Sequence, residues 1–235
     1  LDGEGAVIYD RFGSALLKDV YDDGTPVPYK VVRAFVDDGQ ADSVVIYGGA
    51  GDDVFSGATA RDADGLYVLN VSRQTPSILY SVDQGAAATD GFTLYTLGGN
   101  DNVDFKDVGK DRDSGESQLL AMTLDVGAGN DLILGTQWND SLVSGSGDDR
   151  VSGNRGVDSF SDASGNDQLI ETRDSNFTIS RNVLTIGSEA ESTIAPFETV
   201  ILNGGAAHNT FNVSDWTGTL RIDGAGEGDV YNIHY

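Results

Sequence analysis

Aspartate recurs every nine residues between residues 126 and 171. An apolar residue follows each of these aspartates at the second position, and glycine precedes all but one of them at the second position. The aspartates are Asp131, Asp140, Asp149, Asp158 and Asp167, the apolar residues are Ile133, Leu142, Val151, Phe160 and Leu169, and the preceding residues are Gly129, Trp138, Gly147, Gly156 and Gly165. Matches at three coupled positions in consecutive repeats indicate a tandem nonapeptide.

The nonapeptide predicts half a coil, because its glycine-rich turn of about six residues is followed by a strand of about three. Two nonapeptides then form one turn of a parallel β-solenoid, in which residues eighteen apart stack at a spacing of roughly 4.8 Å. The apolar residues point inward and build a narrow core coil by coil. The glycines allow the positive φ angles of a tight turn.

The same spacing predicts two columns of aspartates on opposite edges of the solenoid. Asp131, Asp149 and Asp167 form the first column, and Asp140 and Asp158 form the second. Two carboxylates one strand spacing apart repel each other by roughly 3 kcal/mol at an effective dielectric constant near 20. A hard divalent cation removes this repulsion, and Ca²⁺ accepts six to eight carboxylate and carbonyl oxygens.

Residues 48–56, with the sequence GGAGDDVFS, resemble a full copy of the hemolysin-type (RTX) calcium-binding nonapeptide, and residues 126–171 are similar to it in a looser form. The resemblance implies a right-handed parallel β-roll in which the sixth-position aspartate and turn carbonyls hold calcium between coils. Matched by position, the strongest candidate ligands are Asp131, Asp149 and Asp167, with Gly127, Gly129, Gly145 and Gly147 in the turns of the first two. Asp53 in the full copy and Asp101 in a shortened copy at residues 97–105 are further candidates.

The second column is the weaker set of metal ligands. The turns before Asp140 and Asp158 depart from the glycine pattern, most clearly at Thr136 and Trp138. In the alternative interpretation these aspartates cap backbone amides of a metal-free turn. The same alternative applies to the first column, where the regular glycines favour calcium.

We expect a single elongated, all-β solenoid over residues 1–235, cut from a larger protein, because neither end carries a distinct polar cap. Residues 1–105 predict irregular coils, and residues 106–118 an exposed loop. Acids at Asp62 and Asp64, and at Asp111, Asp113 and Glu116, could bind a cation, but solvated turns explain them better. Residues 172–235 resemble irregular parallel β-helix segments of very large bacterial surface proteins.

The chain carries 38 acidic and 14 basic residues, for a formal charge of −24, and no cysteine. Non-specific nucleic-acid binding needs clustered Lys and Arg, so this composition argues against it. No apolar run is long enough to span a membrane. An extracellular protein without disulfides can be stapled by metal ions instead, so we expect a secreted or cell-surface location.

Catalysis has little support in the sequence. There is no thiol nucleophile, no Gly-x-Ser-x-Gly elbow, and the two histidines, His208 and His234, are placed in a repeat turn and near the chain end. The alternative is a polysaccharide-active enzyme or glycan-binding module with a cleft built from Tyr67, Tyr80, Tyr95, Arg155, Arg173 and Arg181. We expect instead a calcium-stabilised adhesin stalk, spacer, surface-layer or filament segment. Its partners would be calcium ions, domains or copies stacked on its ends, and surface glycans.

Overall fold

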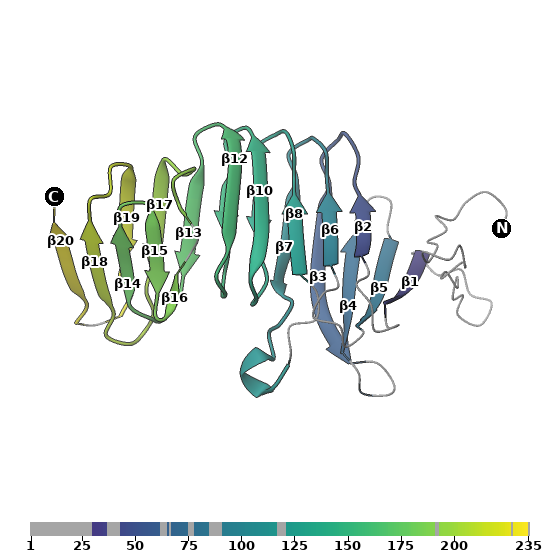
Figure 1. The fold of residues 1–235 in the computed structure, drawn as a ribbon, viewed down its shortest axis with the longest axis horizontal. Helices are drawn as coiled ribbons and strands as arrows, with labels where there is room; N and C mark the ends of the chain where they lie inside the picture. Colours follow the sequence, from purple (N-terminus) through teal and green to yellow (C-terminus); the bar gives the residue numbers. More distant parts are fainter. Residues whose placement is uncertain are drawn as a thin grey trace.

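The computed structural model describes residues 30–36, 43–61, 65, 67–74, 78–84, 91–116, 121–190, 193–226 and 228–234. These residues form an all-β structure of twenty strands with one short 3-10 helix. In Figure 1 the strands lie side by side along the long axis of an elongated molecule. No helix in this part of the chain has the length and apolar character to cross a membrane.

The strands form one long sheet and two short sheets. In spatial order, the long sheet contains β1 (Lys30–Val36), β5 (Ile78–Gln84), β4 (Tyr67–Arg73), β3 (Val54–Arg61), β7 (Asn102–Asp107), β9 (Leu132–Leu134), β11 (Arg150–Ser152), β13 (Gln168–Thr172), β17 (Thr199–Asn203) and β19 (Thr219–Asp223). The first short sheet contains β12 (Ser159–Ser164), β10 (Asp140–Ser146), β8 (Ala121–Asp125), β6 (Gly91–Tyr95) and β2 (Ser43–Tyr47). The second contains β16 (Glu189–Ala190), β15 (Val183–Ile186), β14 (Phe177–Ser180), β18 (Thr210–Ser214) and β20 (Val230–His234).

From β6 to β13 the chain alternates between the first short sheet and the long sheet, and each strand pairs in parallel with the strand two places along. In the tandem nonapeptide, Val151 pairs with both Ile133 and Leu169. The strand pairing therefore has the eighteen-residue register that the repeat predicts.

The core lies between the facing sheets. The five apolar residues of the nonapeptide are at most 5% exposed there: Ile133, Leu142, Val151, Phe160 and Leu169. In the parallel register Ile133, Val151 and Leu169 follow one another on successive coils, as do Leu142 and Phe160, which is the stacking that the sequence pattern predicts.

Two excursions break the parallel pairing, and both lie where irregular coils were expected. Strands β3, β4 and β5 pair antiparallel, as do β14, β15 and β16. The nonapeptide period stops after residue 56 in the first segment and is missing in the second. In the first, alternating apolar residues such as Leu69 and Val71 bury one face of a hairpin instead. A turn at Arg181, with a φ of 55°, joins β14 to β15.

The segment 106–118, predicted as an exposed loop, is exposed at most of its described residues but also contains regular structure and buried residues. Lys106 and Asp107 end β7, and a 3-10 helix, η1, spans Arg112–Ser114. Val108 and Glu116 are only 6% and 3% exposed. Residues 117 and 118 lie outside the described part of the chain, as do residues 1–29 and the predicted turn acids Asp62 and Asp64.

Arg112 anchors this segment to the edge of the neighbouring coil. Its guanidinium donates to the carbonyl of Gln137 at 2.6 Å and forms an ion pair with Glu189 at 3.1 Å. The guanidinium also lies 4.9 Å from the centre of the Trp138 ring. Side chains that are distant in the sequence therefore hold the insertion in place.

Candidate metal centre

The sixth-position aspartates stack into a column along one edge of the long sheet. The backbone N–H of each aspartate donates to the Oδ1 of the aspartate in the following coil, over 2.6–2.8 Å. The column ends where the N–H of Asp167 donates to Oε2 of Glu198 at 2.8 Å. We call the following residues the acid column: Asp53, Asp101, Asp131, Asp149 and Asp167.

Glycines bring the turns of the column close together. Gly129 and Gly147 have φ angles of 142° and 129°, which residues other than glycine rarely adopt. A Cβ on Gly147 would lie 1.8 Å from the carbonyl oxygen of Gly129, and a Cβ on Gly145 would lie 1.8 Å from that of Gly127. Larger residues at these positions would force the coils apart and break the column.

The carbonyl of Gly127 already accepts a hydrogen bond from the N–H of Ser146 at 2.9 Å. A carbonyl oxygen has two lone pairs, so this bond leaves one for a metal. The sequence predicts a place in the metal site for four glycines, Gly127, Gly129, Gly145 and Gly147. Their main role in this structure is to shape the turn.

A second, exposed ladder runs beside the acid column. The side-chain oxygen at the fifth position of each repeat accepts a hydrogen bond from the backbone N–H of the equivalent residue in the following coil. The N···O distances are 2.7–3.0 Å. Its members are Asp52, Asn100, Asn130, Asp148 and Asn166. The prediction from the aspartate period overlooked this ladder, although an Asn or Asp directly before each aspartate of the acid column was the available signal.

The acid column is buried, at 0–4% exposure. The second oxygens, Oδ2, of Asp101, Asp131, Asp149 and Asp167 are buried without a hydrogen-bond partner. Burial, together with neighbouring carboxylates, raises the pKa of Asp131 to about 7 and that of Asp167 to about 6. Burial also raises the pKa of Asp101 and of Asp149.

Buried carboxylate oxygens without donors are costly unless a proton or a cation satisfies them. Oxygen ligands in register on successive turns fit a hard divalent ion such as Ca²⁺. The residues that fit this role are Asp101, Asp131, Asp149 and Asp167.

Asp53 has a different environment, although it belongs to the most complete nonapeptide. Its Oδ1 accepts from Nε and Nη2 of Arg73 at 2.9 and 2.7 Å, and its Oδ2 accepts from the N–H of Gly49 at 2.6 Å. Asp53 as a metal ligand stays a prediction, and in this structure the guanidinium of Arg73 neutralises its carboxylate.

The second predicted column consists of Asp140 and Asp158, which lie on the opposite edge. The N–H of Asp140 donates to Oδ1 of Asp158 at 2.8 Å. The carboxylate of Asp140 accepts from both the N–H and the hydroxyl of Thr136, at 2.6 and 2.9 Å. These bonds favour the capping role that the departures from the glycine pattern suggested.

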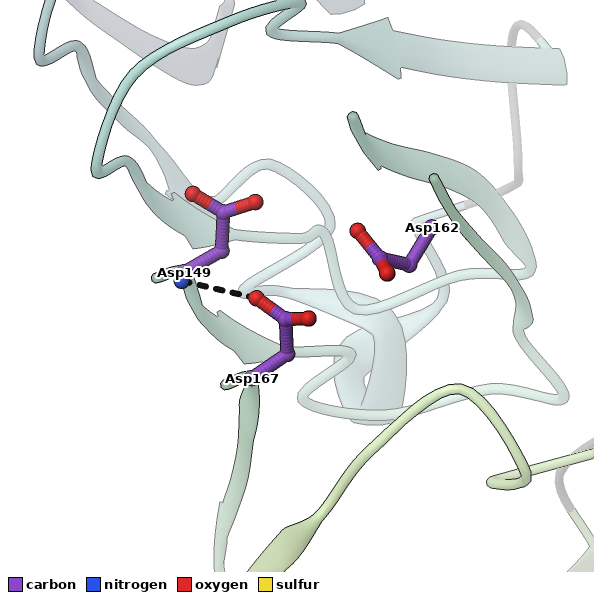
Figure 2. Close-up of side chains that lie close together, drawn as sticks. All are labelled: Asp149, Asp162 and Asp167. Carbon is purple, nitrogen blue, oxygen red and sulfur yellow. Dashed lines mark hydrogen bonds between the residues drawn. The ribbon is translucent and has the colours of Figure 1, made fainter. Parts of the chain in front are cut away.

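Three carboxylates meet at the last turn of the tandem repeat. One oxygen each from Asp149, Asp162 and Asp167 lies within 4.8 Å of the others (Figure 2). Sequence reasoning missed Asp162, which stands at the first position of its nonapeptide, where the preceding coils carry Ser144 and Val126. An acid at a position without acids in the other coils was the available signal.

A family model for the RTX calcium-binding nonapeptide repeat, in four copies, matches residues 38–62, 125–160 and 134–169. The chain carries RTX calcium-binding repeats. RTX repeats bind calcium and are typical of secreted bacterial proteins. Searches of curated proteins and of solved structures found no match.

The acid column is longer than the matched RTX repeats. The matched residues include Asp53, Asp131, Asp149 and Asp167, whereas Asp101 and the terminating Glu198 lie outside them. A coil with a poor RTX sequence can therefore still place an acid in register.

Two tyrosines of the alternative sugar-binding cleft lie on different sheets. Tyr67 lies on β4 in the long sheet, and Tyr95 lies on β6 in the first short sheet, stacked on Tyr47. The arginines of this set are paired with acids, namely Arg155 with Asp113, Arg173 with Glu189 and Arg181 with Asp215. The side chain of Tyr80 lies outside the described part of the structure.

Proposed function

We propose that the chain is a calcium-stabilised structural module of a secreted or cell-surface bacterial protein. It would act as a spacer, adhesin stalk, surface-layer segment or filament segment, without catalysing a reaction. The observation that carries the proposal is the acid column, whose buried Oδ2 atoms have no hydrogen-bond partner on Asp101, Asp131, Asp149 and Asp167.

The architecture we propose is a right-handed parallel β-solenoid with two antiparallel excursions. The alternation of strands between two sheets and the eighteen-residue register of β9, β11 and β13 support it. Contacts in such a fold run between neighbouring coils, so the length of the module follows from the number of coils. This property suits a spacer.

Coupling between calcium and folding is the proposed mechanism. When bound, calcium supplies two positive charges and is coordinated by the carboxylate oxygens that have no hydrogen-bond partner. The folded turns hold the oxygens of Asp131, Asp149 and Asp167 in register through the ladder of backbone hydrogen bonds. The unfolded chain does not. Each site that binds only the folded state adds about 2.7 kcal/mol of stability at a free calcium concentration a hundred times its Kd.

The net negative charge of the chain opposes folding when calcium is absent. With a formal charge of −24, the calcium-free chain repels itself, and the repulsion is strongest where carboxylates stack. A compartment poor in calcium would leave the folded coils weakly stable, and export into a calcium-rich medium would stabilise them. Neighbouring domains, further copies of the chain and surface glycans are the partners that we propose for the finished module.

Calcium titration of the chelator-treated chain tests the proposal. We expect calcium to increase strand circular dichroism and to raise the melting temperature, while magnesium at the same concentration has a much smaller effect. A matched variant carries Asn at 131, 149 and 167, which keeps the Oδ1 acceptors of the ladder and removes the charges. It should fold without calcium and should not respond to it. A wild-type chain that ignores calcium would overturn the proposal.

A further inference from the structure

Asp162 is placed beside the acid column by an irregularity in the strand pairing. Between β10 and β12, Val143 pairs with Ser161, but Asp162 then pairs with Gly145, so Ser144 is left over as a bulge. A β-bulge changes the direction of side chains at its position. Here it coincides with the carboxylate of Asp162 facing those of Asp149 and Asp167 (Figure 2).

Ser144 holds Asp162 in this position. The serine is 2% exposed, and its hydroxyl donates to Oδ1 of Asp162 at 3.2 Å. In the next coil, Asp162 occupies the sequence position of Ser144 itself, eighteen residues on. The last turn thus carries an extra charge that the preceding turn does not have.

Asp149 and Asp167 each have a carboxylate oxygen without a hydrogen-bond partner close to the carboxylate of Asp162. Asp149 and Asp167 are 1% and 0% exposed, and the Oδ2 of each is buried without a hydrogen-bond partner. In the described part of the chain, no Lys or Arg forms an ion pair with any of the three acids. One calcium ion, with Ca–O distances of about 2.3–2.6 Å, can bridge oxygens that lie within 4.8 Å of one another.

We propose that Asp149, Asp162 and Asp167 form the tightest divalent-cation site of the molecule, with Asp162 as the ligand that sets its affinity. The inference rests on the proposed calcium-binding function of the acid column and goes beyond it, because Asp162 is not at the sixth position of its repeat. Calcium affinity rises with the number of charged ligands, so this site fills first as calcium increases. The coils around β12 and β13 are therefore the first to be fixed.

The test compares Asp162→Asn with Asp148→Asn by calorimetric calcium titration of the full chain. Each variant loses one charge. Asp162→Asn keeps the acceptor for Ser144, and Asp148→Asn keeps the acceptor for the N–H of Asn166. Asp148 is exposed in the outer ladder beside Asp149, so it controls for the general loss of negative charge. We expect the highest calcium affinity to fall at least tenfold in Asp162→Asn and less than threefold in Asp148→Asn.

The outcomes separate this inference from the function on which it rests. Equal affinities in the two variants, with calcium binding intact in the wild type, would overturn the inference alone. A wild type that binds no calcium would overturn both. If Asp162→Asn does not fold, Asp162→Ser, which copies the residue of the preceding coil, replaces it. A crystal structure with calcium gives an independent answer: the inference requires an ion coordinated by a carboxylate oxygen of Asp162 and fails if the ion lies elsewhere.

Discussion

At the scale of single residues, each aspartate of the acid column other than Asp53 has two separate tasks. Its Oδ1 accepts a backbone N–H from the preceding coil, a task that an asparagine could perform equally well. Asn209, at the other edge of the C-terminal coils, takes part in a related ladder: its N–H donates to Oδ1 of Asp229 in the following coil, and its own Oδ1 accepts from the N–H of Gly205 in the same turn. The second oxygen of the carboxylate is what distinguishes Asp131, Asp149 and Asp167, and it is the oxygen without a partner.

The exchange of Asp149 for Asn therefore tests the second task alone. We expect Asp149→Asn to weaken calcium binding by at least tenfold, because it removes one ligand oxygen and one charge while keeping the acceptor for Asp131. The matched control is Asp158→Asn on the opposite edge, which should change calcium affinity by less than threefold. Calorimetric titration measures both, and equal losses would contradict the difference that we assign to the two edges.

Arg73 forms an ion pair with the buried carboxylate of Asp53. In Arg73→Gln, the buried carboxylate loses its cation, which should destabilise the calcium-free chain by about 2–4 kcal/mol in urea unfolding. We also expect calcium to restore more stability to this variant than it adds to the wild type, since Asp53 then becomes available as a ligand. Unchanged stability in the absence of calcium would show that the ion pair between Arg73 and Asp53 contributes nothing.

At the scale of elements, Trp138 explains why one turn departs from the glycine pattern. The indole lies under the guanidinium of Arg112 and against Gly109, whose φ is +81°. A Cβ on Gly109 would lie 2.3 Å from Nε1 of Trp138. The departure from the repeat is thus the docking point of the 106–116 segment.

Trp138→Gly restores the sequence of the repeat but should destabilise the fold. We expect a loss of about 1–3 kcal/mol from the missing packing and the missing cation–π contact. Hydrogen exchange should show less protection in residues 112–116, while calcium affinity stays within threefold of the wild type because the acid column lies on the other edge. A variant as stable as the wild type, with unchanged exchange, would contradict the role given to Trp138.

At the scale of the whole molecule, the raised pKa values couple stability to pH. The folded pKa of Asp131, about 7, lies above the ordinary value of 3.8, so the folded state binds more protons than the unfolded state between these values. Stability from this group is therefore complete below pH 4 and is lost as the pH rises through 7. For Asp131 alone the full effect is on the order of 4 kcal/mol, and Asp101, Asp149 and Asp167 act in the same direction.

Without calcium, we therefore expect the melting temperature to increase as the pH falls from 8 to 5. With saturating calcium the trend should weaken or reverse, because protons then compete with the ion for the same oxygens. The variant with Asn at 131, 149 and 167 should show a much smaller pH dependence. A calcium-free wild type that becomes less stable between pH 8 and 5 would refute the assignment of buried, orphaned carboxylates.

The fold of the tandem repeat could be predicted from sequence because its contacts repeat. A period of nine residues decides which residues face inward and which stack, so Ile133, Val151 and Leu169 were placed in the core, and the register of Asp131, Asp149 and Asp167 followed from the same arithmetic.

Only the tertiary structure decided the contacts that cross the period. An antiparallel hairpin carries Arg73 to Asp53, a bulge turns Asp162 toward Asp149, and Glu198 reaches the end of the acid column from a coil without a clear repeat. The spacing of residues in the sequence does not predict these contacts, because each one joins a regular coil to a segment that does not follow the nonapeptide repeat. The nine-residue period determines which residues face the core and which stack on successive coils. The long-range packing of the segments that interrupt the repeat determines which carboxylates are left without a partner and can bind a metal.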